Sequence, residues 1–131
     1  MANPNIVNVT AIYGTTTYYI PSGTTAVVLL PNAASSGLVY KINQIVVANT
    51  TASAANATVA LYSNGAVAQG SAPAGGTAYP IVSTISVPAY ASLIAVDKTT
   101  AIYLMEGTSI SITSGTSSAL TYTISYESIA S

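Results

Sequence analysis

The chain lacks most of the side chains on which catalysis, metal binding and cross-linking depend. It contains no cysteine, histidine, arginine, tryptophan or phenylalanine, and charged residues make up only 4% of its 131 residues. Without cysteine, neither disulfides nor thiolate metal sites can hold the fold, so stability must come from packed secondary structure. Two lysines are too few for a nucleic-acid interface, because phosphate neutralisation dominates the affinity of such interfaces.

Five charged residues remain: Lys41, Asp97, Lys98, Glu106 and Glu127. The formal net charge is −1, so copies of the chain repel one another only weakly and association is favoured. We expect these few charges to orient or solvate the molecule.

Long hydrophobic runs are missing too, although hydrophobic residues make up 50% of the chain. The longest apolar runs, at 26–31 and 45–48, fall far short of the roughly 20 residues that a membrane-spanning helix needs. The first five residues have no basic start and no apolar segment follows them, so we expect no signal peptide. The chain is therefore expected to be made in the cytoplasm and to have no membrane partner.

The residues that are abundant are typical of β-sheets. Thr, Val, Ile and ten Tyr favour strands, because branched and aromatic side chains fit a pleated surface. Apolar and polar residues alternate with a period of two at 57–62, 109–113 and 120–127, which indicates strands with one face on a core. Turn residues delimit ten predicted strands: 6–13, 16–20, 25–30, 38–48, 57–63, 81–87, 92–96, 101–104, 109–113 and 120–128.

This pattern predicts an all-β protein, a single antiparallel β-sandwich of about 8–10 strands over residues 1–131. Both a jelly roll and an immunoglobulin-like Greek key fit the spacing. The apolar phase of strand 38–48 shifts between Ile42 and Ile45, which predicts a β-bulge. The dipeptide Asn64-Gly65 is typical of a hairpin turn that needs positive φ.

The stretch 65–80 is rich in Gly, Ala, Ser and Pro and is predicted to be a long loop within the domain. Two interpretations fit it equally: an arm that reaches a neighbouring molecule, or a disordered surface loop.

The few groups able to carry chemistry form no recognisable motif. A Ser–Lys pair would need Lys98 buried with a lowered pKa, and a glycosidase would need Glu106 and Glu127 across a cleft. A Ca²⁺ site could use Asp97, Glu106 and nearby oxygens, although no acidic loop motif supports it. A role as solvated polar residues in turns and at strand ends explains these charged residues better. We therefore expect no catalytic, cofactor-binding or metal-binding residue, and no enzyme.

Tyrosine is the residue type best suited to contacts, because it offers area and a hydroxyl at low entropic cost. Four tyrosines on strand faces or near loops are candidate interface residues: Tyr18, Tyr19, Tyr79 and Tyr90. Tyr18 and Tyr19 should point to opposite faces of one strand, so one of them should leave the core. The alternative is that Tyr replaces the missing Phe and Trp inside, which we expect for three others: Tyr103, Tyr122 and Tyr126.

Segments over most of the chain form a recognisable set: 1–14, 41–43, 85–89, 92–93, 97–98, 102–110 and 125–129. In these segments the chain resembles small virion structural proteins of marine tailed phages, particularly cyanophages. It departs from that pattern at Glu106-Gly107-Thr108, where a carboxylate often follows the Gly, and in a longer, Gly/Ala-rich stretch at 65–80.

The resemblance implies a non-enzymatic virion component present in many copies, with the major capsid protein or other virion proteins as partners, and a homo-oligomer. A head decoration or cement protein is the first interpretation, and a tail, neck or fibre subunit is the alternative. Two further hypotheses remain. One is a glycan-binding module in which Tyr79, Tyr90 and Asn64 converge. The other is a secreted fibre or surface-layer subunit, which the absence of a signal disfavours.

Overall fold

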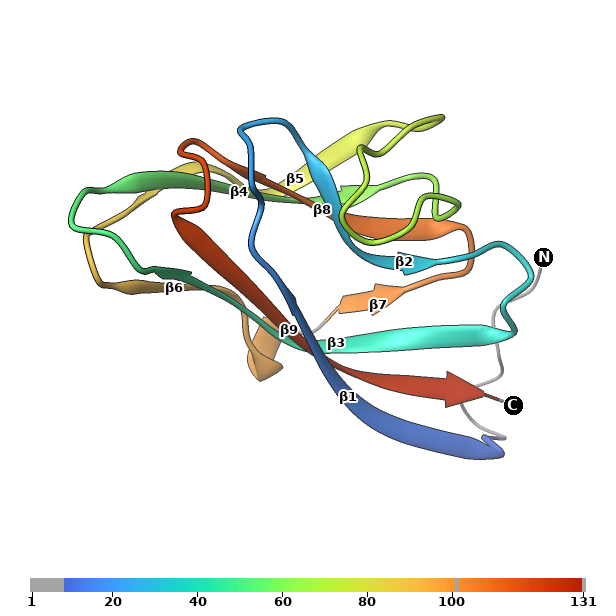
Figure 1. Ribbon diagram of the computed structural model, residues 1–131. Helices are drawn as coiled ribbons and strands as arrows, with labels where there is room; N and C mark the ends of the chain where they lie inside the picture. The colour runs from blue at the N-terminus through green and yellow to red at the C-terminus, as the bar shows by residue number, and fades with distance from the viewer. Residues whose placement is uncertain (1–8, 101, 131) are drawn as a thin grey trace.

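Two antiparallel β-sheets pack face to face in the computed structural model, which describes residues 9–100 and 102–130 (Figure 1). The strands are β1 (Ala11–Tyr19), β2 (Val27–Asn32), β3 (Leu38–Asn49), β4 (Ala55–Tyr62), β5 (Ala78–Val87), β6 (Ser92–Val96), β7 (Ile102–Leu104), β8 (Thr108–Ser114) and β9 (Leu120–Ala130). A short 3₁₀ turn, η1 (Lys98–Thr100), separates β6 from β7. Within the described residues, no helix is long and apolar enough to cross a membrane.

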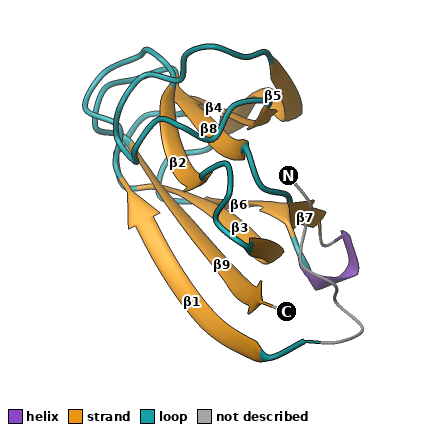
Figure 2. Cartoon of the chain, turned by 90° about the vertical axis from the view of Figure 1, so that its right-hand side faces the viewer, coloured by secondary structure: helices purple, strands orange, loops and turns teal. Residues whose placement is uncertain are grey.

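The chain is paired like one long antiparallel hairpin that has been rolled up. β4 pairs with β5 at its tip, β3 with β6 and β7, β2 with β8, and β1 with β9. Rolling adds β9 to β3 and β8 to β4, which gives the sheet orders β1-β9-β3-β6 and β2-β8-β4-β5. Figure 2 shows the two sheets one above the other. The predicted all-β sandwich is confirmed, and its topology is the jelly roll.

Most predicted strands are present, and two features differ. The predicted strands 16–20 and 6–13 belong to one strand, β1, because Gly14 continues the ladder opposite Glu127; residues 6–8 lie outside the described part. Strand β5 begins at Ala78, inside the predicted loop. The bulge in β3 is confirmed: Ile42 pairs with Tyr126 and Gln44 with Ser125.

The Asn64-Gly65 hairpin turn is wrong. Gly65 is buried in an irregular segment, and its φ is not among the positive values of the described glycines. A Cβ at position 65 would clash with the carbonyl oxygen of Asn32 and lie 2.6 Å from that of Thr108. Glycine is needed here because two backbone segments approach each other closely, and not because a turn requires positive φ.

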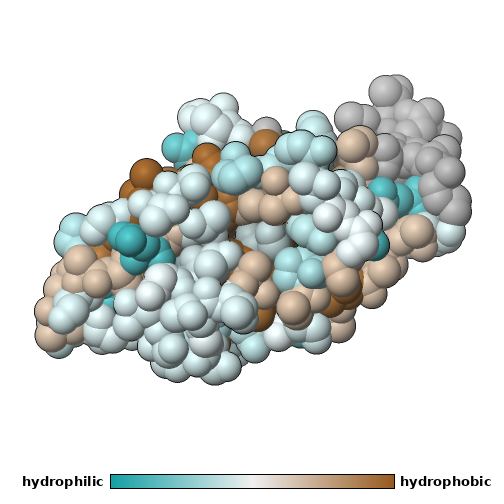
Figure 3. Space-filling view, turned by 90° about the horizontal axis from the view of Figure 1, so that it is seen from above, coloured by the Kyte–Doolittle hydropathy of each residue, from teal (hydrophilic) through white to brown (hydrophobic). Residues whose placement is uncertain are grey.

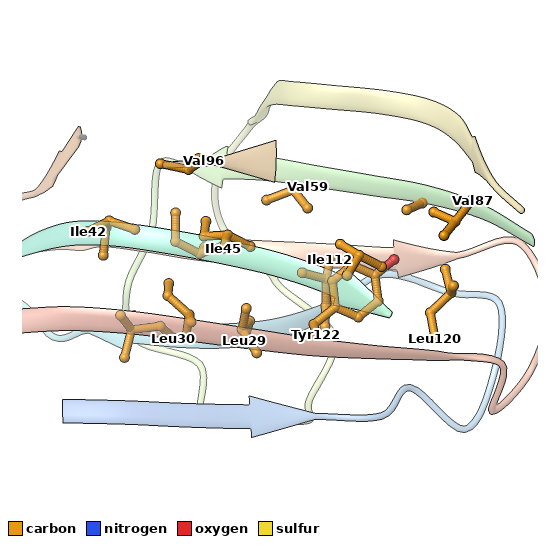
Figure 4. Close-up of a cluster of buried hydrophobic side chains, with 14 of the residues drawn as sticks. Leu29, Leu30, Ile42, Ile45, Val59, Val87, Val96, Ile112, Leu120 and Tyr122 are labelled. Atoms are coloured by element: carbon orange, nitrogen blue, oxygen red, sulfur yellow. The ribbon is translucent and has the colours of Figure 1, made fainter. Parts of the chain in front are cut away.

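The core fills the space between the sheets, where side chains such as Leu29, Ile45 and Val59 meet (Figure 4). Tyr122 is confirmed as a core residue, and its hydroxyl donates a 2.7 Å hydrogen bond to the Thr113 carbonyl. Tyr126 packs against the edge of this cluster. Tyr103 was expected inside but is 48% exposed, because it lies opposite Lys41 on the outer face of its sheet.

Two buried asparagines tie the sheets together. Asn32, at the end of β2, donates from Nδ2 to the carbonyl oxygens of Leu38 and Leu104 in the other sheet, 3.0 Å away in each case. Asn49, at the end of β3, donates from Nδ2 to Val87 at the end of β5, at 3.0 Å. The bonds to Leu104 and Val87 are buried, so they also satisfy carbonyl groups that have little access to water.

The loop at 63–77 is folded back against β2, and a contact of this loop with a neighbouring molecule stays a prediction. Gly70 donates to the Val28 carbonyl, and Val28 donates to the Ser71 carbonyl, both at 2.9 Å. The Gln69 amide donates to the Leu29 carbonyl at 2.8 Å. The loop therefore covers the outer edge of β2, one of the two edges of the four-stranded sheet.

The first prediction concerns Asn49. Asn49→Ala should lower the free energy of unfolding by about 1–3 kcal/mol, because it leaves buried backbone groups without partners. Urea denaturation followed by circular dichroism measures the change. The control is Asn56→Ala on β4, whose exposed side chain should matter by less than about 0.5 kcal/mol. Equal effects of the two variants would contradict a cross-sheet role for Asn49.

The second prediction concerns Gly65. Gly65→Ala should destabilise the fold by about 1–3 kcal/mol, because backbone atoms must move to admit the methyl group. Gly14→Ala is the matched control, since nothing in the described part of the chain lies within 4 Å of a Cβ there. Thermal melts of the two variants should separate clearly, and a parent-like melt for Gly65→Ala would refute the close approach.

Candidate functional site

The free edge of the four-stranded sheet is β5, which pairs only with β4 among the described strands. All of its residues except Val82 and Val87 are exposed. Three β5 residues lie opposite β4 residues that face the core: Tyr79, Val82 and Ile85. Paired residues point to the same side of a sheet, so these three side chains are on the inner face of the four-stranded sheet. Tyr79 is nevertheless 60% and Ile85 43% exposed, because this face continues past the rim of the sandwich. We call Tyr79, Val82 and Ile85 the β5 strip.

The β5 edge has only some of the usual protection against pairing with another chain. Pro80 removes one backbone donor, and the β4–β5 register shifts twice. Thr84 has a φ of 52°, which also disturbs the ladder. Charge is absent, since no charged residue lies between Lys41 and Asp97 in the sequence. Accordingly, the face in Figure 3, seen from above Figure 1, is mostly pale with brown groups and little deep teal.

The structure places the four candidate interface tyrosines in different surroundings. Tyr18 is 68% exposed, whereas Tyr19 packs against the core, so the two do point to opposite faces. Tyr90 is 74% exposed in the turn between β5 and β6. Tyr79 belongs to β5 and not to a loop. Three of the four are thus accessible, and their roles in contacts stay predictions.

The proposed glycan grip of Tyr79, Tyr90 and Asn64 is not assembled. Tyr79 lies near the start of β5 and Tyr90 beyond its end. At about 3.3 Å per residue, the span from Tyr79 to Val87 alone is roughly 26 Å. A single sugar cannot contact both rings.

The charged residues serve their own local structure. Glu106 Oε2 accepts a 3.1 Å hydrogen bond from the Gly37 amide, and Lys41 Nζ lies 4.0 Å from Glu127 Oε1. Asp97 Oδ1 accepts from the Thr99 amide at 2.9 Å and hydroxyl at 2.6 Å. These hydrogen bonds hold the pKa of Asp97 below its usual value.

Two of the arrangements considered for these residues, the Ser–Lys pair and the Asp97–Glu106 metal site, are not assembled. Lys98 is exposed and not buried as a Ser–Lys pair would require. Asp97 follows the residue paired with Ile45, whereas Glu106 bonds to Gly37, about 26 Å away along β3. In the described part of the chain, no three His, Cys, Asp or Glu residues gather to hold a metal ion.

A hollow of about 270 Å³ lies on the outer face of the five-stranded sheet, at the bulge of β3. It is lined by Asn43, Gln44, Asp97, Lys98 and Ser125. The bulge residue Asn43 holds its Oδ1 buried without a hydrogen-bond partner among the described residues. The sequence analysis did not identify this site. Its only sequence signal was the phase shift that predicted the bulge.

Tyrosine rings also cluster at the inner face of the same sheet. The rings of Tyr40 and Tyr126 lie 4.9 Å apart, tilted by 47°. Burial raises the pKa of Tyr122 and Tyr126, and of Tyr40, for which the neighbouring Tyr126 adds a further increase. The folded state therefore favours these phenols in their neutral form.

The raised pKa values predict alkaline destabilisation. The stabilisation is fully present below the unfolded pKa of about 10, and is lost as the pH rises through the folded values. The free energy of unfolding should therefore fall steeply above pH about 10. Tyr126→Phe should flatten this dependence, because it removes one of the phenols whose pKa burial raises. Urea titrations at a series of pH values measure the free energy of unfolding. The same fall with pH in Tyr126→Phe and in the parent would contradict the argument.

Comparison with known proteins does not assign the chain to a family. No protein-family model, no curated protein and no solved structure matches it. The exposed β5 edge and the hollow at the β3 bulge are therefore interpreted from their own geometry.

Proposed function

We propose that the protein is a non-enzymatic structural component of a bacteriophage particle that decorates or cements the capsid lattice. The observation that carries the proposal is the uncharged, exposed β5 edge with its strip of Tyr79, Val82 and Ile85. The resemblance of the sequence to phage virion proteins, over segments such as 1–14 and 102–110, points the same way.

The low charge suits a protein that packs against many neighbours. A surface without charged groups has few ions to desolvate, so apolar and hydroxyl groups can be buried at low cost. The loop at 63–77 covers the β2 edge, so strand-to-strand contacts of this sheet are directed to β5. The expected partners are the major capsid protein or other virion proteins, together with further copies of the chain in a symmetric oligomer.

The fold is compatible with this role but does not assign it. Jelly rolls occur in viral capsid proteins and in lectins alike. This is an analogy of architecture, and function depends on the sites that a fold carries. A tail, neck or fibre subunit stays the alternative, because the β5 strip would serve assembly there equally well. The glycan grip of Tyr79, Tyr90 and Asn64 is not favoured, since the rings of Tyr79 and Tyr90 lie at opposite ends of β5.

The decisive experiment is to locate the protein in intact particles of the phage that encodes it. Mass spectrometry of gradient-purified particles should detect the chain in many copies, and cryo-electron microscopy should show it on the head lattice. Density on the tail or neck would favour the alternative. Absence from intact particles would reject a virion role altogether.

The β5 strip gives a prediction at the level of one residue. Ile85→Lys should weaken binding to particles lacking the protein by about tenfold or more, because the lysine would be buried unpaired in the contact. It should also lower the mass in solution if the free protein is an oligomer, as light scattering would show. Ile94→Lys is the matched control, since Ile94 is also exposed but lies on β6 of the other sheet. Unchanged binding by Ile85→Lys would exclude the β5 strip as the contact.

A further inference from the structure

Strand β1 is the most open edge of the protein. It lies at the margin of the five-stranded sheet and pairs only with β9 among the described strands (Figure 2). Every residue from Ile12 to Thr16 is exposed, and so is Tyr18. In an antiparallel pair, every second residue of an edge strand directs its N–H and C=O away from its neighbour, so β1 offers a row of unpaired backbone groups.

Each of the other three edges has some protection that β1 lacks. The loop at 63–77 covers β2, and β5 is interrupted by Pro80, two register shifts and the positive φ of Thr84. The far edge of the five-stranded sheet consists of two short strands, β6 and β7, with Asp97 and Lys98 between them. β1 instead forms nine consecutive pairs with β9 without a register shift, and it contains neither proline nor a charged residue. Natural proteins rarely leave such an edge open, so we expect it to be paired in the functional state.

A second copy of the same strand matches this edge. When two β1 strands pair antiparallel about a twofold axis at Thr15, Ile12 of each copy lies opposite Tyr18 of the other, and Tyr13 lies opposite Thr17. Both members of each pair are on the same face, because alternate residues of a strand share a face. Each pair combines an aromatic with a β-branched side chain, which stabilises antiparallel sheets.

The charge distribution also favours a second copy over a charged partner. No charged residue precedes Lys41 in the sequence, so two β1 strands meet without repulsion. Glu127, opposite Gly14 on β9, has its own counterion in Lys41, 4.0 Å away. A strand of another protein that carried charges would bury them here without partners, at a cost in affinity.

The area of this contact suits a reversible dimer. Nine residues of a strand span about 31 Å, and with a sheet about 10 Å thick they give roughly 300 Å² on each copy. Tyr13 and Tyr18, both 68% exposed, can add about 100–170 Å² each, because aromatic side chains bury roughly 150–250 Å². The two copies together then bury at most about 1,000–1,300 Å², near the lower limit of specific interfaces. We therefore expect a weak dimer that exchanges with the monomer.

We propose that β1 pairs antiparallel with β1 of a second copy, which joins the two five-stranded sheets into one continuous sheet across a twofold axis at Thr15. This dimer leaves the β5 strip of each copy free. If the β5 strip holds the protein on a particle, as proposed above, each dimer carries two such strips and attaches at two points, which raises its apparent affinity. Only this last consequence rests on the proposed virion role.

Sedimentation equilibrium of the full chain tests the pairing. The mass should rise from 13.1 kDa toward twice that value between about 1 μM and 1 mM protein. Tyr18→Glu and Ile12→Lys should each weaken the dimer about tenfold or more, because an unpaired charge enters the contact. The double variant should recover most of this loss, since its new lysine faces the new glutamate of the second copy. Ile94→Lys, exposed on β6 at the far edge of the same sheet, is the control and should keep the parent mass.

The absence of cysteine allows a second test, which reports on the register. Residues paired across the axis have Cα atoms about 4.5–5.5 Å apart, a distance that a disulfide can span. Thr15→Cys should therefore form a covalent dimer with oxidised glutathione, which is reduced as the disulfide forms. Thr15 is exposed, so the substitution leaves the core intact. Ser92→Cys, exposed on β6, is the control and should remain mostly monomeric.

The outcomes separate this contact from the β5 strip. A parent chain that stays monomeric up to about 1 mM overturns the proposal and leaves the edge to a strand of another protein. A dimer that Tyr18→Glu does not weaken and Thr15→Cys does not cross-link overturns β1 as its contact. Ile85→Lys should leave the β1 dimer intact and lower only the mass of larger assemblies that form through the β5 strip. Absence of the protein from particles would reject the virion role without affecting the dimer.

Discussion

The pairing of β3 with β9 is the interaction on which the rest of the structure depends. It runs from Leu38 opposite Ala130 to Asn49 opposite Leu120, and so joins the first half of the chain to its last strand. This ladder places Ile45 opposite Ile124, and both side chains belong to the hydrophobic core between the sheets. Because β1 then pairs with the free side of β9, the same strand holds both the first and the third strand of the chain in one sheet. Such distant pairing closes long loops, which makes folding slow compared with helical proteins of this size.

The bulge at Asn43 solves a conflict within that ladder. Ile42 and Ile45 are both fully buried, although three positions of a regular strand would place them on opposite faces. One extra residue restores the phase, and its side chain is left over on the outer surface. The same insertion therefore completes the core and lines the hollow, so core packing and the shape of the outer surface share one origin.

The strands were predictable because period-two patterns and turn residues are local properties, and the bulge was visible as a shift of phase. The predicted break between strands 6–13 and 16–20 is absent, because a glycine within a strand and a glycine between two strands have the same local sequence signature. The burial of each tyrosine was less predictable. Tyr122 and Tyr103 both lie in strands with similar sequence patterns, but only the side chain of Tyr122 points toward the opposite sheet. The hollow could not be predicted, because Asp97 meets Asn43 only through the pairing of β6 with β3.

The folded-back loop at 63–77 also limits how far identical copies can be joined. Continuous growth of a sheet from molecule to molecule needs two open edges on each subunit, as in a fibril. Here the hydrogen bonds of residues 70 and 71 with Val28 occupy one edge of the four-stranded sheet. Two copies that meet β5 to β5 across a twofold axis then have no further edge of this sheet to offer. By covering the β2 edge, the loop thus limits association through the exposed β5 edge to pairs of molecules and disfavours polymerisation of this nearly uncharged protein through that sheet.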